Sequence, residues 1–88
     1  MNKKFVRELA AIFSKISDQK VAEAFLQDIL TPAELDEISR RWQIVKLLND
    51  GLPQRKIAKK LAVSIGTVSR GSRELQYGTG GLTKALNM

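Results

Sequence analysis

The sequence predicts an all-α fold that contains a helix-turn-helix at about residues 54–76. Apolar residues recur every three or four positions along most of the chain, which is the period of an amphipathic helix. No segment shows the strict alternation of apolar and polar residues that marks a strand. Two short amphipathic segments are separated only by Ala62, Val63 and Ser64, a spacing typical of a helix-turn-helix.

Length and composition limit both the architecture and the chemistry. The 88 residues suffice for one domain, residues 1–88, and a helical core of this size is often completed by a partner subunit. The chain has no Cys and no His, so it lacks the usual ligands of transition metals and the commonest catalytic side chains. We therefore expect a homodimer that is not an enzyme, requires no cofactor and holds no metal.

Charged residues near the N-terminus argue against a signal peptide or a membrane span there. Arg7, Glu8 and Lys15 interrupt the apolar pattern before an uninterrupted apolar segment can form. We expect a cytoplasmic protein that does not bind membranes.

Two amphipathic helices are expected before residue 31. The first covers residues 4–16. Ser17 or Asp18 is expected to cap the start of the second, which ends near Leu30. Their apolar residues fall on one face of each helix, namely Phe5, Leu9, Ile12, Phe13 and Ile16 in the first and Val21, Ala22, Phe25, Leu26 and Ile29 in the second.

The segment Thr31-Pro32-Ala33-Glu34 predicts the start of a long helix. Thr31 and Glu34 have the spacing of a capping box, and Pro32 suits the first helical position. This helix stops at Gly51, a residue suited to a left-handed C-cap. We interpret Trp42 and the apolar residues from Ile44 to Leu48 as core or dimer interface.

The helix-turn-helix follows this long helix. Pro53 is expected to open its first helix, which runs to Leu61, and Ser64 to cap its second, which begins at Ile65. Residues 77–88 are expected to form a flexible tail with at most a short final helix.

Packing inside the helix-turn-helix requires particular side chains. Ala58 is the small residue at which the two helices cross, while Val63 and Val68 fill the space between them. Ala62 stands where a turn glycine is usual, which suggests a slightly different turn, and Gly71 stands where an apolar residue is usual.

The excess positive charge is concentrated in residues 55–73. This stretch has no acidic residue, whereas the other basic residues of the chain equal its acidic residues in number. Its basic residues are Arg55, Lys56, Lys59, Lys60, Arg70 and Arg73. Such a patch favours a polyanionic partner, and the alternative is a solvated lysine-rich face of a helical hairpin.

Double-stranded DNA is the partner that this pattern predicts. Small, apolar or hydroxylated residues at the start of the second helix suit the major groove, and basic residues suit phosphates. We expect base-edge contacts from Ile65, Gly66, Thr67 and Ser69, phosphate or guanine contacts from Gln54 and Arg55, and phosphate contacts from Lys59, Lys60 and Arg73.

Residues 30–75 closely resemble the tryptophan repressor family. The resemblance is strongest in L-T-P at 30–32, Q-R at 54–55 and R-G-S at 70–72. It implies a DNA-binding repressor that folds as an intertwined all-helical homodimer, with one core built by both subunits and a reading head on each side.

The resemblance also implies L-tryptophan as a corepressor. Arg41 and Arg70 match the two arginines that hold the indole ring, Arg70 and Thr31 would hold the carboxylate, and Gly71 would leave room for the ring. Guanidinium planes stack on aromatic rings and bind carboxylates. Glu74 replaces a serine near the ligand's amino group. The alternative for Arg41 is a surface ion pair with Glu37, four residues earlier.

The chain departs from the family in three further respects. The connection before Gln54 is one residue shorter, Ala58 matches a lysine that contacts DNA, and the tail is shorter. Two other functions therefore stay open, a ligand-independent DNA- or RNA-binding helix-turn-helix module and a basic protein-interaction domain.

Overall fold

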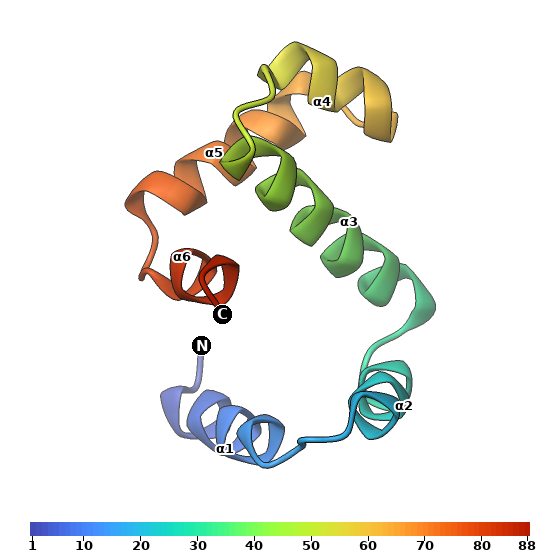
Figure 1. Ribbon diagram of the computed structural model, residues 1–88. Helices are drawn as coiled ribbons and strands as arrows, with labels where there is room; N and C mark the ends of the chain where they lie inside the picture. Colours follow the sequence, from blue (N-terminus) through green and yellow to red (C-terminus); the bar gives the residue numbers. More distant parts are fainter. The chain divides into compact units, whose positions relative to one another are not determined.

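A computed structural model describes residues 1–88 as six helices without strands, which confirms the all-α prediction (Figure 1). The helices are α1 (Lys3–Ser14), α2 (Gln19–Ile29), α3 (Pro32–Asn49), α4 (Gln54–Leu61), α5 (Ile65–Tyr77) and α6 (Gly81–Leu86). Contacts within the chain gather into two compact units, Met1–Leu35 and Asp36–Met88. None of the helices combines the length and the apolar character needed to cross a membrane.

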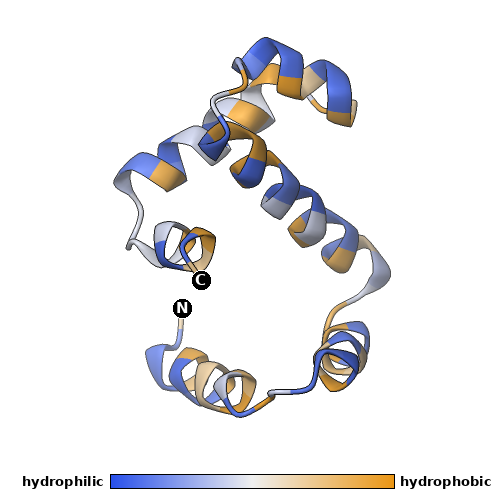
Figure 2. Ribbon diagram, in the orientation of Figure 1, coloured by the Kyte–Doolittle hydropathy of each residue, from blue (hydrophilic) through white to orange (hydrophobic).

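The first unit contains α1 and α2, and no residue of either helix is buried. The side chain of Asp18, one of the two cap candidates, accepts a hydrogen bond from the Lys20 amide at 3.0 Å. Phe13 and Phe25 make an edge-to-face contact between the two helices, with ring centroids 5.9 Å apart. Apolar and polar residues share each helix, as the hydropathy colouring shows (Figure 2).

The predicted capping box begins α3. The Thr31 amide donates to Glu34 Oε1 at 2.8 Å, and the Glu34 amide donates to Thr31 Oγ1 at 3.1 Å. The hydrogen bonds from the backbone and then the side chain of Thr31 hold the pKa of the Glu34 carboxyl below its usual value. These reciprocal bonds explain why the helix starts at this point of the chain.

A glycine ends α3, as the sequence predicts. Gly51 has φ +87°, a left-handed conformation that glycine adopts without a steric penalty. The Gly51 amide donates to the Leu48 carbonyl at 3.0 Å, and the Leu52 amide donates to the Leu47 carbonyl at 3.1 Å. This is the bond pattern of a Schellman motif, which satisfies carbonyls that the helix leaves free.

The second unit has a small buried core to which three helices contribute. Ile44 of α3, Ile57 of α4 and Val68 of α5 form one cluster, and each exposes at most 1% of its surface. Each buried aliphatic side chain of this size stabilises the fold by about 1.5–3 kcal/mol. Partly buried residues pack around the cluster, namely Leu47, Leu48, Leu52, Ala58, Leu61 and Val63.

The turn between α4 and α5 keeps the usual geometry although it lacks glycine. Ala62 adopts a left-handed conformation, with φ 54° and ψ 46°. The Val63 amide donates to the Ala58 carbonyl at 3.0 Å, so this turn is also a Schellman motif. The expectation of a slightly different turn is therefore wrong, because alanine takes the conformation that glycine would supply.

The ends of the helix-turn-helix agree with the sequence apart from one residue. Ser64 caps α5 through a 3.1 Å hydrogen bond from the Thr67 amide. Pro53, expected as the first residue of α4, is instead the N-cap, and its carbonyl accepts from the Lys56 and Ile57 amides. The short final helix is present as α6.

Gly71 lies where α5 approaches α3. A Cβ atom at this position would lie 3.0 Å from Cγ2 of Ile44, closer than ordinary van der Waals contact. The close approach of the two helices thus accounts for the glycine that breaks the usual apolar pattern.

Candidate ligand cavity and nucleic-acid interface

The second unit contains a cavity of about 740 Å³. Residues of α3, α5 and α6 and of the turn after α4 line it. Arg41, Arg70, Gly71 and Glu74, all predicted from the family resemblance to bind a corepressor, are among them. Thr31, the fifth predicted residue, is not a lining residue, and its hydroxyl caps α3.

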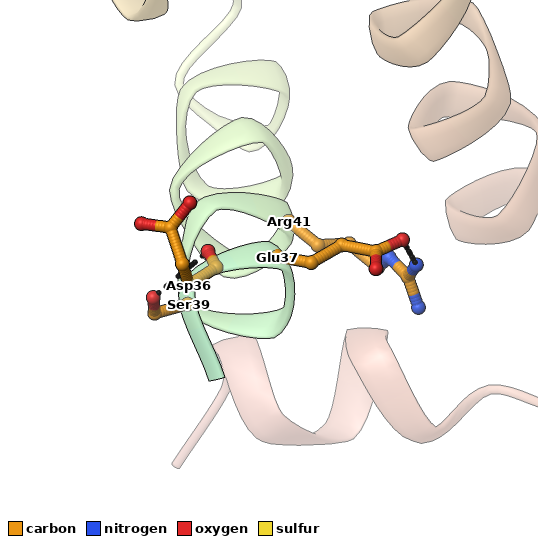
Figure 3. Close-up of polar contacts among 4 residues, drawn as sticks. All are labelled: Asp36, Glu37, Ser39 and Arg41. Atoms are coloured by element: carbon orange, nitrogen blue, oxygen red, sulfur yellow. Dashed lines mark hydrogen bonds and ion pairs between the residues drawn. The ribbon is translucent and has the colours of Figure 1, made fainter. Parts of the chain in front are cut away.

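The charges that α3 contributes to the cavity are already paired. Arg40 lies 3.1 Å from Asp36, and Arg41 lies 3.1 Å from Glu37. Figure 3 shows the Glu37 and Arg41 side chains leaving α3 together. The expected ion pair between Arg41 and Glu37 is thus present, and the contact of Arg41 with a ligand stays a prediction. Exposed pairs spaced by four residues contribute only about 0.3–0.5 kcal/mol, so a ligand could displace this one at little cost.

The charges that α5 contributes are unpaired. Arg70 and Glu74 are one helical turn apart and line the same cavity, and neither forms a salt bridge. The cavity therefore presents one free guanidinium and one free carboxylate on a single helix. Together these groups could hold the carboxylate and the ammonium of a zwitterion.

Apolar side chains form another part of the cavity wall. Ile44 and Val45 come from α3, Val63 from the turn and Leu82 from α6. Gly71 adds backbone surface without a side chain. A ligand that combines charged groups with an apolar body fits this lining.

Thr67, predicted to contact a base edge, is also a lining residue of the cavity. Its hydroxyl is 2.8 Å from Ser64 Oγ at the start of α5. Its spacing from Arg70, Gly71 and Glu74 places all four on one helical face. A direct contact between Thr67 and a base edge therefore stays a prediction, and the structure gives this residue a place in the cavity wall.

A second face of α5 carries the other predicted reading residues. Gly66, Ser69 and Arg73 are spaced by three and four positions, and all three are exposed. Ile65, at the start of the helix, exposes 52% of its surface. One helix thus carries the cavity-lining residues and these predicted reading residues on adjacent faces.

The exposed residues of α4 add positive charge to this region. Arg55, Lys59 and Lys60 are exposed, and none of them forms a salt bridge. Unpaired cations on an exposed surface can neutralise phosphates. Gln54 is half-buried, and its side-chain Oε1 accepts a 2.8 Å hydrogen bond from Ser69 Oγ.

Several cavity residues were not predicted as site residues. Glu37 and Arg40 lie within one turn of Arg41, so helical spacing alone could have indicated them. Val63 and Leu82 had no such signal, because they enter the cavity through the turn and through α6.

Comparison with known proteins identifies the family. The sequence profile of the family described as Trp repressor protein matches residues 4–88. The chain belongs to the Trp repressor family. This is a family of DNA-binding transcription regulators and not of enzymes.

Proteins similar to this chain come from several bacteria. A Trp operon repressor homolog of Actinobacillus succinogenes is 38% identical over 73 residues, which are 82% of this chain and 68% of that protein. One of Chlamydia trachomatis is 36% identical over 69 residues, 73% of each chain. YerC of Bacillus subtilis, described as an uncharacterized protein, is 30% identical over 92% of this chain and 81% of its own. No solved structure matches the chain significantly.

Proposed function

We propose that this chain is a transcriptional repressor that binds operator DNA as a homodimer and is gated by L-tryptophan or a closely related amino acid. The observation that supports this most is the division of α5 into two faces. Arg70 and Glu74 line the cavity, while Gly66, Ser69 and Arg73 lie on the adjacent face of the same helix. A ligand held on one face can therefore bias how the other face meets DNA.

Dimerisation is supported by apolar surface in the first unit. Phe5, Leu9, Ile12 and Phe13 of α1 each leave between 43% and 72% of their surface exposed. Phe5, Leu9 and Ile12 line a groove of about 310 Å³ together with Phe25 and Ile29 of α2. A second copy of the chain would bury these side chains, which water otherwise contacts at a cost. Two copies would place two α5 helices in successive major grooves, about 34 Å apart.

The charge pattern supports an amino acid as the ligand. Arg70 would bind its carboxylate and Glu74 its ammonium, while Ile44, Val63 and Leu82 would contact its side chain. Arg41 would stack on an aromatic ring after leaving Glu37. Because a ligand shifts an equilibrium only through differential affinity, the protein without ligand should bind DNA more weakly and less specifically.

A titration tests this function. A fluorescent duplex selected by the protein from random sequences is titrated with and without L-tryptophan, and calorimetry follows tryptophan binding to the free protein. We expect tighter DNA binding with tryptophan. Tryptamine, which lacks the carboxylate, and indole-3-propionate, which lacks the ammonium, should each bind more weakly than tryptophan.

The same titration separates the two remaining alternatives. DNA binding that is indifferent to tryptophan at every concentration would identify a ligand-independent module. Absence of any salt-dependent DNA binding would instead favour a basic protein-interaction domain.

A further inference from the structure

The hydrogen bond between Gln54 and Ser69 joins the two helices of the predicted reading head. Ser69 Oγ donates to Gln54 Oε1 at 2.8 Å, although the residues are 15 positions apart. It is the side-chain hydrogen bond that links α4 to α5. Two residues of the buried cluster are close to the bonded pair in sequence, Ile57 three positions after Gln54 and Val68 directly before Ser69.

This bond fixes the direction of the Gln54 amide. A glutamine side chain has one carbonyl acceptor and an NH₂ group with two donors. Since the carbonyl is held by Ser69, the NH₂ group points away from that bond and has no partner within the chain. The Ser69 proton is used in the bond, so Ser69 can offer a partner only its acceptor lone pairs.

We infer that Ser69 is a positioning residue that orients Gln54, and that the Gln54 NH₂ group donates to a hydrogen-bond acceptor on DNA. This inference rests on the proposed DNA-binding function. A free glutamine side chain loses rotamer freedom when it binds, which costs conformational entropy. The bond to Ser69 removes part of that cost before DNA arrives, as preorganisation does in other interfaces.

Two kinds of acceptor on DNA share this chemistry. A phosphate oxygen would make Gln54 a residue that sets position without reading sequence, whereas a base edge would make it a specificity determinant. The two kinds of contact predict different effects of a Gln54 substitution on affinity for different duplexes. Loss of a phosphate contact weakens binding to all sequences about equally, and loss of a base contact weakens binding mainly to the selected sequence.

The first test needs no DNA. Nitrogen-15 relaxation of the side-chain amide measures the mobility of Gln54 in the free protein, with Gln76, an exposed glutamine near the end of α5, as an internal reference. We expect Gln54 to be more ordered than Gln76 in the wild type and as mobile as Gln76 in Ser69→Ala. Equal mobility of the two glutamines in the wild type would overturn the inference.

The second test is a double-mutant cycle on affinity for the duplex that the wild type selects. Ser69→Ala and Gln54→Ala should each weaken binding about 3- to 10-fold, the size expected for one hydrogen bond. Ser69→Ala should weaken binding less than about twofold when Gln54 is already alanine, because Ser69 acts through Gln54. Ser69→Thr keeps the hydroxyl and should restore affinity, and Gln76→Ala is the matched control.

The outcomes distinguish this inference from the proposed function. Equal losses from Ser69→Ala in both backgrounds would show that Ser69 contacts DNA independently, and would overturn the inference while DNA binding stands. Gln54→Glu keeps an acceptor for Ser69 but removes the NH₂ donor. Wild-type affinity for DNA in this variant would therefore also overturn the inference. Failure of the wild type to enrich any duplex would reject the proposed function itself, and the relaxation result would still decide whether Ser69 orients Gln54.

Discussion

Both units of this chain contain amphipathic helices, but the two units differ in what they bury. In the second unit, Ile44, Val45, Ile57 and Val68 are almost completely shielded from water. In the first unit, α1 and α2 bury no residue, and Phe5 exposes 72% of its surface. The second unit thus has a core of its own.

This difference shows what an apolar helical face can and cannot indicate. The face predicts that a helix will be covered, but it does not say by what. Residues of α3, α4 and α5 cover one another within the second unit. Many apolar residues of α1 and α2 stay exposed within the chain. A second subunit could cover them at a dimer interface.

The largest expected effect concerns the core of the second unit. Ile57→Ala should lower the free energy of unfolding by about 2–5 kcal/mol, because it removes a fully buried side chain and leaves a cavity. Ile65→Ala is the matched control, since Ile65 is half exposed, and should change stability by less than about 0.5 kcal/mol. Urea unfolding measures both, and equal losses would refute the assignment of the core.

A smaller effect is expected at the proposed subunit interface in the first unit. Leu9→Ala should weaken dimerisation about 10- to 100-fold, the equivalent of one apolar contact of about 1.4–2.8 kcal/mol. Sedimentation equilibrium measures the dissociation constant, and Arg7→Ala is the control on the same helix. A dissociation constant that Leu9→Ala leaves unchanged would place the interface elsewhere.

Gly71 tests how tightly the second unit is packed. Gly71→Ala should destabilise the protein by about 1 kcal/mol, because overpacking against Ile44 outweighs the higher helix propensity of alanine. Gly66→Ala, whose added Cβ would meet only Ser64 Oγ at 3.8 Å, should be neutral or slightly stabilising. Thermal unfolding followed by circular dichroism compares the two variants, and a stabilising Gly71→Ala would contradict the close approach of α5 to α3.

The smallest effect is the pH dependence of the capping box at the start of α3. The lowered pKa of Glu34 means that its ionised form stabilises the folded state. This contribution is complete above the ordinary glutamate pKa and is lost as the pH falls through the lowered value. The stability difference between wild type and Glu34→Ala should therefore shrink in acid, and a difference that is constant with pH would contradict the assignment. The free energy of unfolding of both proteins, measured from neutral to acidic pH, gives this stability difference.

The sequence alone determined the local structure, and its family resemblance predicted several residues of the candidate site. The capping box, Gly51 and the Ser64 cap are interactions over a few residues, so their spacing specifies where helices begin and end. Arg41, Arg70, Gly71 and Glu74 were predicted from the family resemblance, and all of them line one cavity.

Only the tertiary structure decided which groups meet. It left Arg70 and Glu74 without a salt bridge and formed one cavity from residues of α3, α5 and α6 and of the turn after α4. It also joined Gln54 to Ser69 and showed that Ala62 takes the left-handed turn. These outcomes depend on how helices cross and on which of several partners a side chain reaches, and residue spacing within one helix does not contain that information.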